Sequence, residues 1–327
     1  GIWPALGRLA QARGADVVHI QYQAAAYALH PAINLLPWWL RLTRPRLRTV
    51  VTFHDLRVPY LFPKAGPLRW GSILALAVGC HGAILTNVED DDRLARYGGR
   101  IQRFRIPIGV NIPRLSDPTF HREAQRARWG VAPETLLLCH FGFLNESKGF
   151  EDLVDALALI QTQDHAHPLR LLVIGGVAGS SDPTNVRFIE RIRQRIADRG
   201  LEHLIAWTGY VSEEEASANL LCSDLAVLPY RDGASFRRGT LLVALTHGLP
   251  TVTTTPAVRT PELRHGENVW LAPARQPTAL AEAIAQLAAQ PQLRARLGAQ
   301  ANQLGVLFRW ETIAQRTQEA YREVLAR

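Results

Sequence analysis

Methionine is absent from this sequence and cysteine is scarce, with three residues among 327. Cys80, Cys139 and Cys222 lie far apart and form no CxxC pair, which excludes a zinc ribbon. Because all three lie in or beside apolar segments, we interpret them as reduced core cysteines of a cytoplasmic protein. A chain that begins with Gly1 and holds no methionine has either been processed or, as we expect, lacks its true N-terminal segment here.

Nucleotide-binding fingerprints and long apolar runs are missing as well. Neither GxGxxG nor GxxxxGK[ST] occurs, which removes the main support for a Rossmann oxidoreductase or a P-loop NTPase. No charge-free apolar run reaches the roughly 18 residues of a transmembrane helix, so none is expected. No clustered histidines and carboxylates indicate a metal site, and we expect neither a metal nor another cofactor.

The composition is that of a globular protein large enough for two domains. Hydrophobic residues make up 47% and charged residues 20%, which excludes a disordered chain. The net charge of +8 suits a polyanionic partner, such as nucleic acid, a phosphorylated ligand or an anionic membrane surface. Charge alone does not choose among these partners.

Short apolar runs alternate with amphipathic stretches along the whole chain. This alternation predicts parallel sheets covered by helices on both faces. The predicted strands form two series, 16–20, 48–53, 82–86 and 103–107, then 135–141, 169–174, 204–208, 225–228, 251–254 and 268–271. Predicted helices include 149–161, 277–290 and a charged one at 308–327. The segment 109–117 separates the two series, so a domain boundary is expected within it.

Short sequence motifs lie at the ends of these predicted strands. They are FHD at 53–55, IPIGVN at 106–111, FGFLNESKG at 141–149, LLVIGG at 171–176, TGYVS at 208–212, LAVLPYRDG at 225–233, GLPTV at 248–252, PE at 261–262, GEN at 266–268 and FRWE at 308–311. In this order and spacing they resemble the motifs of family 4 glycosyltransferases, and the resemblance covers nearly the whole chain.

The resemblance implies an α/β fold of GT-B type, with two Rossmann-like domains facing each other across a cleft and the first domain incomplete. It implies an acceptor-side domain at 1–112, a donor-binding domain at 113–307 and a last helix at 308–327 that crosses back to the first domain. The implied activity is retaining, metal-independent transfer of a sugar from a nucleotide-diphosphate sugar to a glycan, lipid-linked or small-molecule acceptor. Cell-envelope or exopolysaccharide synthesis is the implied setting.

One motif departs from the family pattern. The two glutamates of the family's E-x7-E signature fall on Ser235 and Val243, and the arginine that often precedes the family's lysine falls on Phe143. The same loop gains Arg237 and Arg238. Because the second glutamate usually holds the ribose hydroxyls, we expect this loop to grip the diphosphate more and the ribose less than usual.

The resemblance and the chemistry of diphosphates together predict the donor site. Lys148 and Arg238 are the predicted catalytic cations, because a nucleoside diphosphate leaves with negative charge. Two arginines before an apolar helix oppose its dipole, which favours an anion bound there. The predicted donor-binding residues are Gly142, Lys148, Tyr210, Val211, Ser235, Arg237, Arg238, Gly239 and Thr240.

On the acceptor side, His54 and Asp55 end a predicted strand, where sites form in α/β folds. The resemblance implies that His54 lies near the donor sugar, and we count it among the catalytic residues. The expected partners are the nucleotide sugar and its acceptor, and nucleic acid is not expected.

Two alternatives stay open. Residues 33–48 combine Trp38 and Trp39 with several arginines, which fits either a peripheral contact with an anionic membrane or a core-facing helix followed by a basic linker. The loss of both signature glutamates also allows a catalytically inactive GT-B scaffold that acts as a binding or partner subunit.

Overall fold

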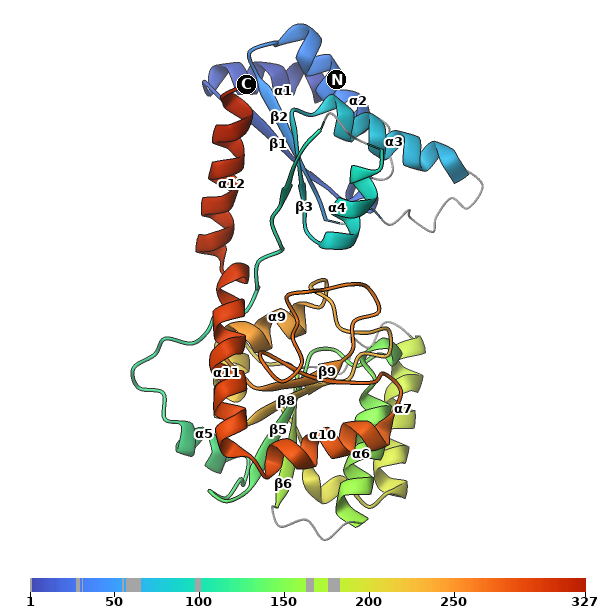
Figure 1. Cartoon of the computed structure of the whole chain (residues 1–327), viewed down its shortest axis with the longest axis vertical. Helices are drawn as coiled ribbons and strands as arrows, with labels where there is room; N and C mark the ends of the chain where they lie inside the picture. Colours follow the sequence, from blue (N-terminus) through green and yellow to red (C-terminus); the bar gives the residue numbers. More distant parts are fainter. Residues whose placement is uncertain are drawn as a thin grey trace. The chain divides into compact units, whose positions relative to one another are not determined.

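The computed structural model describes residues 2–27, 30, 32–54, 56, 66–97, 101–162, 168–175 and 183–327. The chain forms two compact units (Figure 1). Unit 1 comprises Gly1–Gly109 and Trp310–Arg327, and unit 2 comprises Val110–Arg309. The two passages between the units thus lie at 109/110 and 309/310, compared with the expected boundaries at 112/113 and 307/308.

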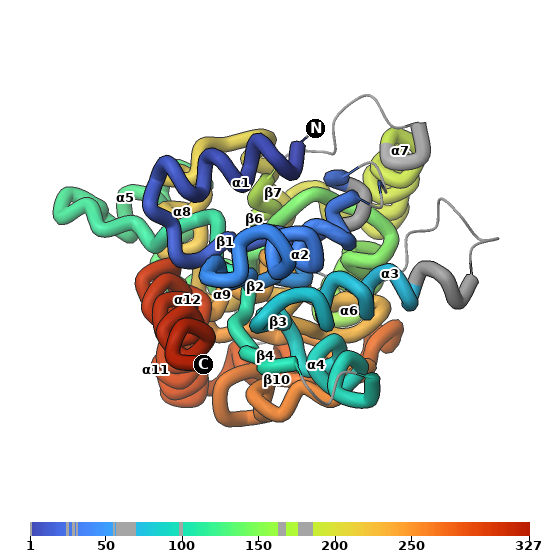
Figure 2. The backbone as a smooth tube through the Cα atoms, turned by 90° about the horizontal axis from the view of Figure 1, so that it is seen from above, coloured from blue at the N-terminus to red at the C-terminus, as the bar shows by residue number. Residues whose placement is uncertain are grey.

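Unit 1 is built on a four-stranded parallel sheet in the order β1-β2-β3-β4. Its strands are β1 (Val17–Tyr22), β2 (Arg48–Phe53), β3 (Gly82–Leu85) and β4 (Gln102–Arg105). Its helices are α1 (Ile2–Ala12), η1 (Ala24–Tyr27), α2 (Ala32–Thr43), α3 (Gly66–Gly79), α4 (Val88–Ala95) and α12 (Trp310–Leu325). Helices α2 and α3 pack against each other, as the view from above shows (Figure 2).

Alternating side chains of β2 and β3 face two different cores, as the pleat of a strand requires. Val51, Phe53 and Leu85 join the buried residues of α1 to α4. Val50 and Ile84 lie on the opposite face and pack against α12. The last helix of the chain therefore covers one face of the first sheet.

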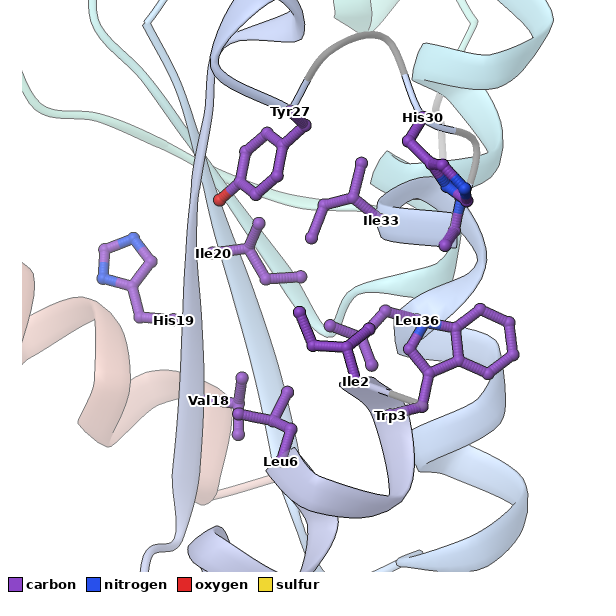
Figure 3. A pocket seen from close by; sticks show the side chains of 11 residues that line it. Ile2, Trp3, Leu6, Val18, His19, Ile20, Tyr27, His30, Ile33 and Leu36 are labelled. Atoms are coloured by element: carbon purple, nitrogen blue, oxygen red, sulfur yellow. The ribbon is translucent and has the colours of Figure 1, made fainter.

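An apolar cavity of about 470 Å³ lies among α1, β1 and α2 (Figure 3). Leu6, Ile20 and Leu36 are among the side chains that line it. Figure 3 also shows His19 on the other side of β1 from Ile20, as the alternation along a strand demands. Among the helices of the described residues, none combines the length and apolar character needed to cross a membrane.

The interpretation of Trp38 and Trp39 as helix-packing residues agrees with the contacts of α2. The indole of Trp38 donates a hydrogen bond of 2.8 Å to the carbonyl of Ala75 on α3. Trp39 packs against the core of unit 1 and lies 6.1 Å from the ring of Trp3.

Unit 2 is built on a six-stranded parallel sheet in the order β10-β9-β8-β5-β6-β7. Its strands are β5 (Leu136–Phe141), β6 (Leu169–Ile174), β7 (Ile205–Trp207), β8 (Leu225–Leu228), β9 (Thr251–Thr254) and β10 (Trp270–Ala272). Its helices are α5 (Arg122–Arg128), η3 (Glu146–Lys148), α6 (Phe150–Thr162), α7 (Pro183–Asp198), η4 (Glu202–Leu204), α8 (Glu213–Cys222), α9 (Gly239–Thr246), α10 (Pro277–Ala288), α11 (Pro291–Gly305) and η5 (Val306–Phe308).

The strand order of unit 2 reverses at β5, which pairs with β6 on one side and β8 on the other. On the two sides of this reversal, the chain leaves the carboxyl ends of the strands in opposite directions. The loops after β5 and β8 therefore enclose a crevice of the kind in which α/β proteins bind ligands. Local signals fix the helices around it. The hydroxyl of Ser212 accepts from the amide of Glu215 at the start of α8, and Pro277 begins α10.

Candidate functional site

The turn after β5 requires glycine at Gly142. This residue has a φ of +111°, and a Cβ built on it would lie 2.6 Å from Cγ2 of Thr240 and 3.7 Å from Nζ of Lys148. A side chain here would meet both unfavourable backbone conformation and a steric clash. The absence of a side chain thus lets the first turn of α9 lie against the end of β5.

Lys148 ends the short helix η3 and points toward α9. Its ammonium donates to the hydroxyl of Thr240 at 3.2 Å and lies 5.4 Å from the ring centroid of Tyr230. Burial, followed by repulsion from Arg238, lowers the pKa of Lys148 to about 8. The carboxylate of Asp232 acts in the opposite direction and partly favours the charged form of Lys148.

Arg238 occupies the N-cap position of α9, and its guanidinium is directed toward the same turn. It donates to the hydroxyl of Ser147 at 3.3 Å, forms an ion pair with Asp232, and lies 4.9 Å from the ring centroid of Tyr230. Asp232 is 56% exposed in its side chain, which makes it a partner that a stronger anion can displace.

The start of α9 adds backbone donors to the two cations. Its N-cap side chain forms no capping bond, and space is open around Gly239, the first residue of the helix. Free amides at a helix N-terminus attract anions through the aligned peptide dipoles. Lys148, Arg238 and these amides are thus three sources of positive potential around one turn.

Tyr230 is a central residue of this site that sequence reasoning missed. It is fully buried, its hydroxyl pairs with the hydroxyl of Thr240 at 2.6 Å, and its ring faces Lys148 and Arg238. Burial raises the pKa of the Tyr230 phenol, so it stays neutral. Its position directly after β8 and Pro229 is the available signal, because side chains after parallel strands line such crevices.

A second arginine in the same loop is already neutralised. Arg231 forms ion pairs with Glu151 at 2.7 Å and with Asp152 at 3.0 Å, and it also approaches Glu146. Its contacts anchor the loop to α6. By contrast, the contacts described for Lys148 and Arg238 together include one carboxylate, that of Asp232.

Two further predicted donor residues, Tyr210 and Val211, lie in the loop after β7. Tyr210 is 85% exposed and Val211 is half-buried. That loop approaches the site through Gly209, which forms a bridge with Gly175, and a Cβ on Gly175 would lie 3.4 Å from the backbone of Gly142.

The predicted residues of the loop before α9, and Val243 within that helix, differ in how deeply they are buried. Ser235 is half-buried, and its carbonyl accepts the amide of Arg238 at 3.0 Å. Arg237 is half-buried beside it. Val243, which stands at the second signature position, is fully buried in the core of unit 2. The structure therefore places Gly142, Lys148 and Thr240 next to one another, and Arg238 lies beside them at the ring of Tyr230. The side chain of Val243 lies in the core.

His54 belongs to unit 1, directly after β2. It is half-buried, and its Nε2 donates to Oε1 of Gln21 at 2.9 Å. Gln21 is the penultimate residue of β1 and is another residue that sequence reasoning missed. Asp55 lies outside the described residues. In the part of the chain that the structure describes, no three His, Cys, Asp or Glu side chains are grouped as metal ligands would be.

Comparison with known proteins finds a family match within unit 2. Residues 135–290 match the family model described as Glycosyl transferases group 1. A D-inositol 3-phosphate glycosyltransferase of Paenarthrobacter aurescens is 26% identical over 245 residues, which are 74% of this chain and 57% of that protein. The chain thus spans little more than half the length of the curated relatives it matches.

Solved structures agree on the fold. Sucrose-phosphate synthase from Thermosynechococcus elongatus has a TM-score of 0.71 at 21% identity, over 99% of this chain and 77% of that one. Anabaena HepE in complex with UDP has a TM-score of 0.75 at 20% identity, over 98% and 82%. The expected GT-B type of fold, with two parallel α/β sheets, is confirmed.

Proposed function

We propose that this chain, whose residues 135–290 form a glycosyl transferase group 1 domain, is a retaining, metal-independent glycosyltransferase that uses a nucleotide-diphosphate sugar. One observation supports this most: Lys148, Arg238 and the N-terminal end of α9, which no side chain caps, surround a single turn. A sugar nucleotide delivers two phosphates whose charge grows as the glycosidic bond breaks. Fixed cations and amide dipoles stabilise that charge in the transition state.

The proposed roles follow from these contacts. Lys148 acts as a point charge on one phosphate, and Arg238 exchanges its Asp232 partner for phosphate oxygens. Tyr230 and Thr240 hold both cations in place. Two protein cations and a helix N-terminus supply positive charge of the kind a divalent ion would supply, which is our reason to propose metal-independent transfer.

The acceptor side of the proposal concerns unit 1. We assign His54, with Asp55, to the acceptor side of the reaction, and a glycan, a lipid-linked sugar or a small polyol as acceptor. The relative named D-inositol 3-phosphate glycosyltransferase supports a polyol, and the UDP complex of HepE makes uridine diphosphate sugars the first donors to test. A cytoplasmic role in cell-envelope or exopolysaccharide synthesis completes the proposal.

Donor binding and transfer are tested in two steps. Thermal unfolding with UDP-glucose, GDP-mannose and other nucleotide sugars should reveal at least one that raises the Tm of the wild type and leaves that of Lys148→Ala unchanged. Release of nucleoside diphosphate in the presence of mixed polyol and glycan acceptors then measures transfer. Stabilisation without transfer by any acceptor would favour the inactive scaffold, and no stabilisation by any nucleotide would refute the donor site.

A peripheral membrane contact is a second, separate proposal for unit 1. Leu42 is 85% and Leu35 is 48% exposed on α2, and Arg44 and Arg46 follow the helix. Exposed leucines next to arginines suit an anionic lipid surface. Co-sedimentation with phosphatidylglycerol vesicles should fall for the double variant Leu42→Ser/Arg46→Glu, and neutral phosphatidylcholine vesicles should bind neither protein. Equal sedimentation of variant and wild type would refute the contact.

A further inference from the structure

A second cavity of unit 1, of about 480 Å³, lies between the sheet and α12. Its volume is within the range of roughly 300–1,000 Å³ that small-molecule sites occupy. It opens on the face of the sheet that carries His19, opposite the apolar cavity of Figure 3. Side chains from the carboxyl ends of β1 and β2, residues 106–109 and one side of α12 line it. Carboxyl ends of parallel strands are where α/β folds bind ligands.

Linked polar side chains occupy the sheet side of this cavity. His54 donates from Nε2 to Gln21, whose amide nitrogen lies 3.3 Å and 3.4 Å from the two ring nitrogens of His19. His19 in turn bonds the hydroxyl of Tyr321 at 2.6 Å and that of Thr52 at 2.7 Å. Burial, with repulsion from His54, lowers the pKa of His19 to about 4, so its imidazole is neutral at pH 7. The network therefore presents fixed dipoles to the cavity.

An aromatic side chain lies on the other side of the cavity. Trp310 begins α12 and is 58% exposed. A Cβ on Gly109 would lie 2.7 Å from its indole ring, so glycine at this position allows the ring to lie directly on the backbone. An indole face next to hydroxyl, amide and imidazole groups suits a ring that has apolar C–H faces and a polar edge.

The side chains that line the cavity indicate the charge of the ligand that it can bind. Among the described residues that line the cavity, none is lysine, arginine, aspartate or glutamate. Arg316, on the same helix, directs its guanidinium to the carbonyl of Arg105 at 2.6 Å. A phosphate group would need cationic partners or aligned amides in the cavity, and the lining offers neutral donors instead.

We propose that this cavity binds a neutral, hydroxyl-rich ring and selects against its phosphorylated form, with Gln21 and Trp310 as the main contacts. The identification of the ring with the acceptor rests on the proposed function; the existence of the site does not. The proposal distinguishes this chain from the relatives whose names specify inositol 3-phosphate. Gln21 would then both form a hydrogen bond with the bound ring and hold the imidazole of His54 in its orientation.

The test measures binding of small rings to the full chain without nucleotide, by saturation-transfer difference NMR. The probes are methyl α-D-glucopyranoside, methyl α-D-mannopyranoside and myo-inositol, with glucose 6-phosphate as the charged counterpart. The variants are Gln21→Leu, which removes the amide at the site, and Trp310→Ala. The matched control is Gln315→Leu, because Gln315 is exposed on α12 and pairs with Glu319 outside the cavity.

At least one neutral ring should bind, and Gln21→Leu should weaken it about three- to tenfold, the effect of one or two lost hydrogen bonds. Trp310→Ala should weaken it at least as much, Gln315→Leu should leave it unchanged, and glucose 6-phosphate should bind at least tenfold more weakly. Binding of no neutral ring, equal binding to Gln21→Leu, or preference for the phosphorylated sugar would overturn the proposal. Because no donor is present, these outcomes are independent of whether Lys148 binds a nucleotide.

Discussion

Because the pKa of Lys148 is lowered to about 8, we expect the affinity for the donor to fall as the pH rises from 7 to 9. With a pKa of about 8, about nine tenths of the free protein carries this charge at pH 7 and about one tenth at pH 9. If the diphosphate binds the protonated form, its dissociation constant should rise about eight- to tenfold between these two values. UDP-glucose is a suitable probe, because its two phosphates are already esterified and do not titrate between pH 7 and 9.

Neighbouring groups do not produce the same profile. Burial lowers the pKa of His140 to about 4 and raises that of Tyr230, so neither changes charge in this window. Titration calorimetry at several pH values would measure the slope. Lys148→Arg keeps its charge throughout and should give a flat profile, since guanidinium does not deprotonate in proteins. A flat profile for the wild type would refute the assignment of Lys148 as the diphosphate ligand.

The same pKa shift makes a second, opposite prediction for stability. The folded pKa of Lys148 lies below the unfolded value of 10.5, so the unfolded chain binds more protons between about pH 8 and 10.5. Stability therefore rises with pH across that window, and below pH 8 the full cost of about 3 kcal/mol is present. Lys148→Met should thus stabilise the nucleotide-free protein by about 1–2 kcal/mol at pH 7, after the loss of the bond to Thr240, while abolishing donor binding. Destabilisation by this variant would show that the ammonium serves the fold.

Three further predictions concern the same turn, and each has a direct measurement. Arg238→Ala should lower kcat/KM at least tenfold, whereas a 2′-deoxyribose donor should cost the wild type only a few-fold; a large deoxy penalty with an unaffected variant would leave Arg238 as surface charge. Gly142→Ala should reduce both Tm and nucleotide affinity, because its Cβ would lie 2.6 Å from Cγ2 of Thr240, and a variant with unchanged affinity would contradict the close approach. Tyr230→Phe should keep the fold, lose the bond to Thr240 and reduce nucleotide affinity about two- to tenfold, measured by calorimetry; wild-type affinity would show that the hydroxyl positions nothing.

The fold was accessible from the sequence because strand periodicity and helix faces are local signals. The alternation of runs predicts four strands and then six, and the described residues form a four-stranded and a six-stranded sheet. The predicted helix at 277–290 corresponds to α10, which begins at Pro277. What the pattern cannot supply is the register of one strand on another, which depends on atoms distant in sequence.

The end of β1 illustrates that limit. The predicted strand ends at Ile20. The structure continues it to Tyr22, where Tyr22 is paired with Phe53 of β2. The two additional residues bring Gln21 beside His54. An error of two residues in the end of this strand thus hid a contact of His54, the only histidine that sequence reasoning assigned to catalysis.

The cations Lys148 and Arg238 around the start of α9 were predicted from the sequence, but the residues that hold them in place were not. Lys148 and Thr240 are 92 positions apart, and the contact between them depends on the β5 and β8 loops meeting at the reversal of strand order. Tyr230 resembles any buried aromatic residue after a strand, since its function depends on two cations brought to its ring by folding. Asp232 escaped notice because its charge pairs with Arg238 only in the folded loop.

The position that the resemblance assigns to the second signature glutamate bears on the inactive-scaffold alternative. Val243 occupies that position, is fully buried in the core of unit 2, and its carbonyl accepts from His247. Its side chain therefore packs in the core, while Arg238 and Thr240 at the start of α9 contact Ser147, Asp232, Tyr230 and Lys148. Positive charge thus lies at the N-terminus of α9, where the helix dipole favours an anion. That combination is more consistent with a changed mode of donor recognition than with a site that no longer binds one.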